Sequence, residues 1–177
     1  MWVFRVLLIA TVLSPNSTPS LGQLGAYYFD TLNQSQVWIN LEPQGLTPGP
    51  NPIRLNVTVA FTGLRLDRTP DVVDVRAESV DGTFPMRIRQ PILRFQLGGG
   101  TEMDLTAPGK AFQFIPRCPD CPLDTVIARM AFDALRQIAE SSTVSIGALG
   151  FTARLKSADL QSLRKFIDVV GNGVLIR

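Results

Sequence analysis

The run from Ile53 to Phe61 constrains the fold more than any other stretch of this sequence. Its apolar residues occupy every second position, with polar or small residues between them. Successive side chains of a β-strand point to opposite faces of a sheet, so this spacing turns one face toward a core and the other toward solvent. The run therefore predicts a β-strand that is buried on one face only.

Several other short segments look extended and are separated by turn-forming residues. The chain has 14 glycines and 13 prolines, and only 18% of its residues are charged, a balance that favours many turns between short strands. The glycines at 98–100 join two alternating runs and predict a β-hairpin. The segment 64–66 is expected to prolong the strand at 53–61 past a bulge at Gly63. We expect further strands at 27–29, 36–41, 72–77, 92–97, 101–106, 111–115, 143–146 and 151–155.

The region 122–140 supports two interpretations. Read as one helix that begins at Pro122, it forms an apolar stripe, but Phe132 and Leu135 fall outside the stripe. The alternative is a strand at 125–130 followed by a short helix at 132–140. We favour this alternative because Ala128-Arg-Met with the apolar residues after it resembles Ala153-Arg-Leu and its following segment. Two copies of a strand followed by a helix would explain both segments.

The final helix is predicted to begin after Ser157, which is expected to cap it, with Asp159 in its first turn where the helix dipole favours a carboxylate. Gly171 is expected to end it. The expected fold class is thus mainly β (α+β): an antiparallel β-sandwich-like domain with one or two short helices near the C-terminus. The length of 177 residues with 45% hydrophobic content suits a single domain that buries its own core.

The first 22 residues have the features of a secretory signal peptide. Arg5 precedes an apolar run at 6–13 that is too short to span a bilayer, and the small residues Ser20 and Gly22 fit a cleavage site. We expect a signal peptide at 1–22, a single β-rich domain at 23–177, and a secreted or periplasmic location. No later segment is apolar enough for a membrane span, so the mature protein is expected to be soluble. Sequons at Asn33 and Asn56 would matter only in a eukaryotic host.

Composition excludes several classes of function. The chain contains no histidine, which removes Ser-His-Asp and Cys-His catalysis and histidine-ligated zinc. Its formal net charge is +2, with no block of like charges, so it lacks the electrostatic footprint of a nucleic-acid-binding protein. The sequence therefore favours a non-catalytic protein over an enzyme, and we expect no cofactor and no metal.

The two cysteines form the tetrapeptide Cys118-Pro-Asp-Cys121. Two cysteines in an exported protein can form a disulfide, and here the bridge would fix a tight turn. The tetrapeptide also resembles the redox motif of thioredoxin-like oxidoreductases, which implies a nucleophilic Cys118 and a resolving Cys121. Pro122 directly follows the second cysteine and no proline occurs after it, so the cis-proline of that family has no counterpart. If a strand follows the cysteines, no helix dipole activates Cys118.

Three further groups of side chains are candidates for binding. Arg87, Arg89 and Arg94 could meet an anionic ligand, although alternating arginines are also typical of the wet side of a strand. An acidic loop suggests Ca²⁺ but lacks the ligand spacing of an EF-hand. An aromatic group could form a sugar-stacking face, or could simply pack in the core. The acidic residues are Asp67, Asp71 and Asp74, and the aromatic residues are Tyr27, Tyr28, Trp38 and Phe61.

These observations favour an exported, non-catalytic binding or interaction module whose partner is an unknown protein or a component of the cell envelope. Two alternatives stay open. One is a thiol-disulfide redox protein that uses Cys118 and Cys121, and the other is a Ca²⁺- or glycan-binding β domain.

Overall fold

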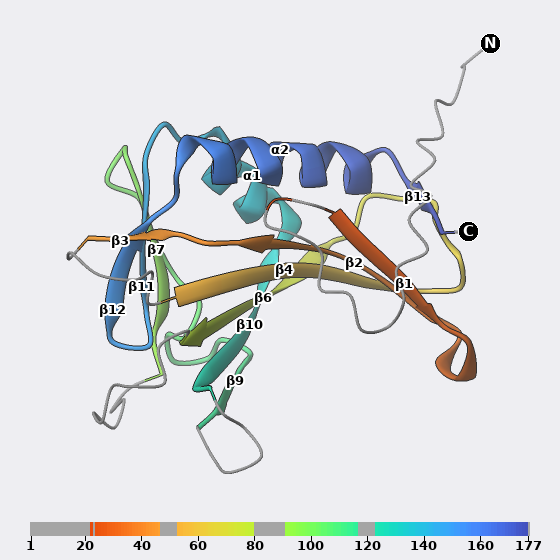
Figure 1. Ribbon diagram of the computed structural model, residues 1–177, viewed down its shortest axis with the longest axis horizontal. Coiled ribbons are helices and arrows are strands. Elements are labelled where there is room, and N and C mark those ends of the chain that lie inside the picture. The colour runs from red at the N-terminus through yellow and green to blue at the C-terminus, as the bar shows by residue number, and fades with distance from the viewer. Residues whose placement is uncertain (1–21, 23, 47–52, 80–90, 117–122, 177) are drawn as a thin grey trace.

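The computed structural model describes residues 22, 24–46, 53–79, 91–116 and 123–176. The described residues form a six-stranded, a five-stranded and a two-stranded sheet, and Figure 1 shows that the α-helices lie over one face of the largest sheet. The helices are α1 (Phe132–Glu140) and α2 (Ser157–Gly171), and a short 3-10 helix covers Asp30–Leu32. The strands are β1 (Leu24–Phe29), β2 (Gln34–Leu41), β3 (Gln44–Gly45), β4 (Ile53–Thr62), β5 (Arg65–Leu66), β6 (Val72–Ser79), β7 (Leu93–Leu97), β8 (Glu102–Asp104), β9 (Phe112–Ile115), β10 (Thr125–Ala131), β11 (Val144–Ala148), β12 (Phe151–Arg154) and β13 (Val174–Leu175).

The large sheet has six antiparallel strands in the order β1-β2-β4-β6-β10-β9. The burial pattern of β4 confirms the strand predicted from the alternating run. Residues 53, 55, 57 and 59 are buried, while the residues between them are more exposed. β2, β6 and β10 bury alternate residues in the same way. The sheet therefore has an inner face that packs under the helices and an outer face that points away from them.

The small sheet has five antiparallel strands in the order β3-β12-β11-β7-β8 and closes one end of the molecule (Figure 1). The hairpin β7–β8 confirms the prediction made from the glycines at 98–100. The strands β11 and β12 form a second hairpin, and Leu149 and Gly150 both adopt positive φ in its turn. The chain passes from the large sheet to the small one at Glu42 and Pro43, between β2 and β3. Together these features confirm the expected mainly β, antiparallel, sandwich-like fold with two helices near the C-terminus.

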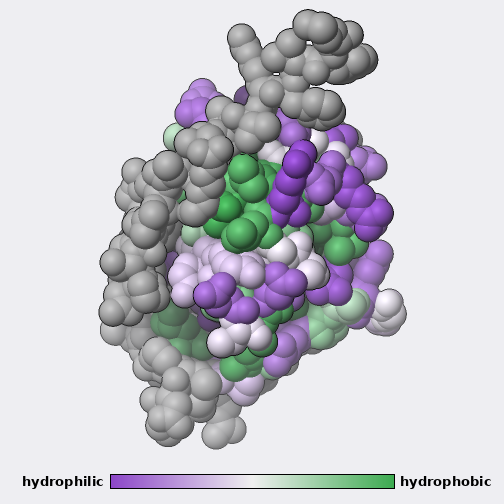
Figure 2. Space-filling model, turned by 90° about the vertical axis from the view of Figure 1, so that its right-hand side faces the viewer, coloured by the Kyte–Doolittle hydropathy of each residue, from purple (hydrophilic) through white to green (hydrophobic). Residues whose placement is uncertain are grey.

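The segment 64–66 does not prolong β4. β5 instead pairs with β13, and the N–H of Ile176 donates to the carbonyl of Leu64. Gly63 has a φ of +77°, which turns the chain out of the large sheet. Figure 2 faces this end of the molecule and shows hydrophobic side chains gathered beside strongly hydrophilic ones.

The region 123–140 consists of a strand and then a helix, as the favoured interpretation predicted. β10 pairs with β6 and β9, and α1 follows it directly at Phe132. The related segment also forms a strand and then a helix, β12 and α2. Within β10, Val126, Ala128 and Met130 are buried while Ile127 and Arg129 between them are more exposed, which is the alternation of a strand and not of a helix.

The cap of α2 differs from the prediction, since Lys156 and not Ser157 is the N-cap. The carbonyl of Lys156 accepts the first helical hydrogen bond, from the N–H of Leu160. Asp159 lies in the first turn, as predicted, and its carboxylate accepts the N–H of Lys156 at 2.9 Å. The third helical residue therefore caps the helix, so no capping side chain is needed from Ser157.

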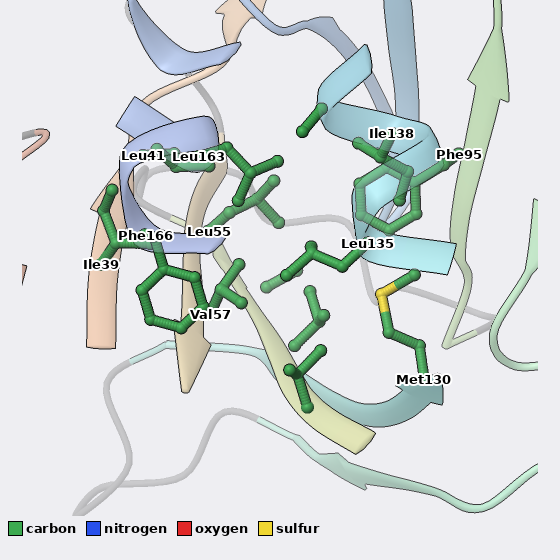
Figure 3. Close-up of a cluster of buried hydrophobic side chains, with 14 of the residues drawn as sticks. Ile39, Leu41, Leu55, Val57, Phe95, Met130, Leu135, Ile138, Leu163 and Phe166 are labelled. Atoms are coloured by element: carbon green, nitrogen blue, oxygen red, sulfur yellow. The ribbon is translucent and has the colours of Figure 1, made fainter. Parts of the chain in front are cut away.

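The core fills the space between the inner face of the large sheet, the two helices and the small sheet. Figure 3 shows Leu163 and Phe166 of α2 over Ile39, Leu41, Leu55 and Val57, and Leu135 and Ile138 of α1 beside Phe95 and Met130. These side chains belong to one continuous cluster. Burial of this apolar surface is the main force that holds the layers together.

The predicted signal peptide lies almost wholly outside the described residues, and so do both cysteines. Gly22, the last residue of that predicted segment, donates its N–H to the carbonyl of Asn40. Among the described helices, none has the length and apolar character needed to cross a membrane.

Replacing Phe166 by alanine should lower the free energy of unfolding by about 3–5 kcal/mol, because a buried aromatic side chain is lost and its cavity closes only in part. Phe166 is 0% exposed. Urea denaturation followed by circular dichroism measures the change. The matched control is Leu32→Ala, at a side chain that is 67% exposed, which should change stability by no more than about 0.5 kcal/mol. Equal effects would contradict this description of the core.

Asp159 supplies a test that depends on pH. Burial raises the pKa of Asp159 above its usual value, and the nearby Glu42 carboxylate acts in the same direction, against the backbone hydrogen bonds from Lys156 and Glu42 that lower it. A raised pKa in the folded state means that folding favours the protonated form. The contribution of the protonated Asp159 carboxyl to stability is complete below the ordinary pKa of the group, and it is lost as the pH rises through the raised pKa.

Asp159→Asn keeps an oxygen that can accept the N–H of Lys156 but removes the charge. The stability of this variant relative to the natural protein should therefore be higher at about pH 7 than at about pH 3. Urea denaturation at the two pH values measures the difference. Asp159→Ala is the control: it also removes the titratable carboxyl, so its relative stability should change with pH in the same way, but it should lie about 1 kcal/mol below that of Asp159→Asn at both pH values because the cap is lost. If the stability difference between Asp159→Asn and the natural protein did not change with pH, the raised pKa of Asp159 and its assignment to burial would be refuted.

Candidate functional site

Of the three arginines that the sequence suggested as an anion site, Arg94 is the one that the structure describes. It lies on the face of the small sheet that points away from the core. Its guanidinium is 3.0 Å from a carboxylate oxygen of Asp104 and its Nε is 3.2 Å from one of Glu102, both on the neighbouring strand β8. Arg87 and Arg89 lie outside the described residues. Arg94 is thus held between two carboxylates.

Asp104 is held in turn by its neighbours. Burial alone would raise the pKa of Asp104, but the N–H of Thr106, the Arg94 guanidinium and the Thr106 hydroxyl together lower it below the usual value. The N–H of Thr106 lies 2.9 Å from the carboxylate. Asp104 therefore remains ionised, and with Glu102 it offsets the charge that Arg94 could offer to an anion.

A hollow of about 350 Å³ lies on the same face, above Gly147 of β11. Gly147 pairs with Arg94 on one side and Thr152 on the other, and a β-carbon built on it would meet no atom within 4 Å. Gln96 and Ser145 also line the hollow. The recess has a mixed polar and apolar lining, and the positive charge of Arg94 beside it is already compensated.

A second groove, of about 480 Å³, runs between α1 and α2. Arg164 donates from Nε to the carbonyl of Ala139 at 2.8 Å, so it supplies a hydrogen-bond donor to a carbonyl group in the last turn of α1. Arg136 lies over the ring of Phe132 and pairs with Asp133 at 3.4 Å. Both arginines therefore already have structural partners, and the bond from Arg164 joins α2 to α1.

The outer face of the large sheet combines aromatic and amide side chains. Trp38 of β2 lies across Gly25 of β1, its cross-strand partner, and a β-carbon on Gly25 would overlap the indole ring. Tyr27 and Phe29, the next residues of β1 on this face, meet edge to face with their ring centroids 4.5 Å apart. A line of aromatic rings therefore follows β1 and β2 on the outer face.

The structure divides the four aromatic residues that the sequence grouped together. Tyr27 and Trp38 lie on the outer face, whereas Tyr28 and Phe61 pack against the core on the inner side. The grouping was wrong for a simple reason, which is that adjacent residues of a strand point to opposite faces. Tyr28 instead donates its hydroxyl to the side chain of Asn33 at 3.0 Å.

Beside the aromatic line, three polar side chains form a chain of hydrogen bonds. Thr58 donates its hydroxyl to the amide oxygen of Asn56 at 2.5 Å, and the amide nitrogen of Asn56 donates to Asn40 at 2.8 Å. Thr58 is the cross-strand partner of Trp38, and Asn56 is that of Asn40. The amides and the indole therefore occupy adjoining positions on one face.

Every charged residue in the six strands of the large sheet points to the outer face and has a partner of opposite charge. Arg129 meets Asp74 through two hydrogen bonds of 2.8 and 3.3 Å. Arg76 lies 2.6 Å from Glu78, and Arg54 lies 3.8 Å from Glu42. The outer face is consequently polar but close to electrically neutral.

The acidic residues and the cysteines that the sequence suggested do not form a site among the described residues. Asp67 pairs with Arg65 and Asp74 with Arg129, and the described residues hold no group of three potential metal ligands. Cys118 and Cys121 lie outside the described residues, but the described chain that follows them enters β10, and α1 starts only at Phe132. Among the described residues, no helix N-terminus directly follows the cysteine tetrapeptide.

Comparison with protein-family models, with curated proteins and with solved structures gave no match to this chain. The candidate site is therefore defined by geometry alone. Sequence reasoning found Tyr27 and Trp38 but missed Gly25, Asn40, Asn56 and Thr58. The register between β1, β2 and β4 brings these residues together, and only the alternation of each strand hinted at their common face.

Gly25→Ala should lower stability by about 1–3 kcal/mol, because the new methyl group must displace the indole of Trp38. The emission of Trp38 should change at the same time, which fluorescence detects in a Trp2→Phe background. The matched control is Gly147→Ala, another strand interior with open space above it, which should gain about 0.5–1 kcal/mol. Unchanged emission in Gly25→Ala would show that the indole does not depend on this glycine.

Proposed function

We propose that this protein is an exported, non-catalytic module that binds a carbohydrate of the cell envelope through the outer face of its large sheet. The observation that carries the proposal is the indole of Trp38, laid across Gly25 beside the hydrogen-bonded side chains of Asn40, Asn56 and Thr58. The sequence features of residues 1–22 support export.

The chemistry of a sugar fits such a face. One side of a pyranose ring presents C–H groups that pack on an aromatic ring, while its hydroxyl groups at the rim both donate and accept hydrogen bonds. Trp38 offers a rigid, amphipathic platform. The amide chain next to it offers donors and acceptors whose positions are already fixed by their own hydrogen bonds, so little side-chain entropy is lost on binding.

The same face supports binding without catalysis. Glycoside hydrolysis requires one carboxyl group that acts as an acid and a second that acts as a nucleophile or base. Asp74 and Glu78 are the carboxylates in the strands of the large sheet, and each is engaged by an arginine. The chain has no histidine to replace either of them.

Trp38→Ala should abolish or strongly weaken binding to polysaccharides. Loss of a central tryptophan anchor typically costs about 2 kcal/mol or more, a decrease in affinity of about 30-fold. The measurement is co-sedimentation with a panel of insoluble polysaccharides that includes peptidoglycan, chitin and cellulose, together with soluble uncharged and acidic polysaccharides tested by affinity electrophoresis.

The matched control is Phe112→Ala, which removes another exposed aromatic side chain from the same sheet but on its inner side. This variant should bind like the natural protein. If the natural protein retained none of the polysaccharides, or if both variants bound equally well, the outer face would not be a carbohydrate site.

A further inference from the structure

We propose that the ligand is an uncharged, extended oligosaccharide that runs along β1 and β2, with one sugar ring on Trp38 and the next on Tyr27. This inference rests on the proposed carbohydrate-binding function and specifies its ligand. It follows from the spacing of the aromatic rings, from the position of the amide chain and from the pairing of charges on the outer face.

The aromatic residues are spaced for successive rings of a chain. Trp38 lies over Gly25, and Tyr27 is two residues further along β1 on the same face. Two residues of a strand advance about 7 Å, so the two aromatic platforms are close enough to contact neighbouring rings of one oligosaccharide. Phe29 packs against Tyr27 and holds it in place, so the second platform is as fixed as the first.

The amide chain lies on one side of this line only. Thr58 stands opposite Trp38 on β4, and Asn40 follows Trp38 by two residues on β2. The hydrogen bonds run from Thr58 to Asn56 and on to Asn40, which leaves the amide N–H groups of Asn40 to donate and the hydroxyl oxygen of Thr58 to accept. The hydroxyl groups of a sugar ring on Trp38 can accept from the amide of Asn40 and donate to the hydroxyl oxygen of Thr58.

The charged side chains of the outer face indicate whether the ligand is a neutral or an acidic sugar. Arg54, Arg76 and Arg129 each have a carboxylate partner, so a sugar carboxylate would have to displace Glu42, Glu78 or Asp74 from its arginine. Breaking such a pair leaves one carboxylate without its cation and gains no net charge pairing. An uncharged sugar disturbs none of them, and its affinity should be nearly independent of salt concentration.

The test titrates the Trp2→Phe protein with mono-, di- and trisaccharides of β-linked glucose and of β-linked N-acetylglucosamine, following the emission of Trp38. A matched series of β-linked uronic acids is titrated in the same way. At least one uncharged series should bind about tenfold more tightly as disaccharide than as monosaccharide, with little change between low and high salt, whereas the uronic acids should bind more weakly.

Tyr27→Ala should remove the gain from the second ring, so that mono- and disaccharides bind this variant with about equal affinity, and Tyr27→Phe should preserve the gain. Circular dichroism and urea denaturation establish that both variants are folded. Equal affinity of the parent Trp2→Phe protein for mono- and disaccharides, a preference for uronic acids, or an unchanged length dependence in Tyr27→Ala would overturn the inference while carbohydrate binding itself still stood. Absence of binding by every saccharide and polysaccharide would overturn the proposed function as well.

Discussion

The structure depends on one-sided burial of the large sheet. Alternate side chains of β2, β4, β6 and β10 enter a single core with α1, α2 and the small sheet, while every charged side chain of the sheet is excluded to the outer face. Burial of the inner set supplies most of the free energy that offsets chain entropy. It also fixes the register, because a slip of one residue would exchange the two faces. The composition of the outer face is thus a consequence of how the core is formed.

Much of the fold is visible in the sequence because it is encoded locally. The alternation of residues 53–61 gives the faces of β4, the glycines at 98–100 give the hairpin, and the resemblance of Ala128-Arg-Met to Ala153-Arg-Leu favours a strand before α1. The rest depends on contacts between distant residues. Neither the pairing of β5 with β13 nor the passage between sheets at Glu42 and Pro43 has a local signal, so 64–66 was assigned to the wrong neighbour.

The candidate site was predicted only in part, for a related reason. The aromatic residues are conspicuous, but the alternation of β1 already forbids Tyr27 and Tyr28 from sharing a face. The glycine that accepts the indole and the amides beside it become neighbours only through the register of three strands. For Arg94 the sequence indicated solvent exposure, but its charge is compensated by Glu102 and Asp104 from an adjacent strand whose register the sequence did not specify.

The position of α2 and β13 in the chain has a consequence for biogenesis. α2 supplies Leu163 and Phe166 to the inner face of the large sheet, and β13 pairs with a strand more than a hundred residues earlier. A nascent chain that ends before α2 therefore lacks the side chains that cover part of that face. For the export that we propose, such late closure suits a polypeptide that is threaded unfolded through a translocation channel and folds on the far side.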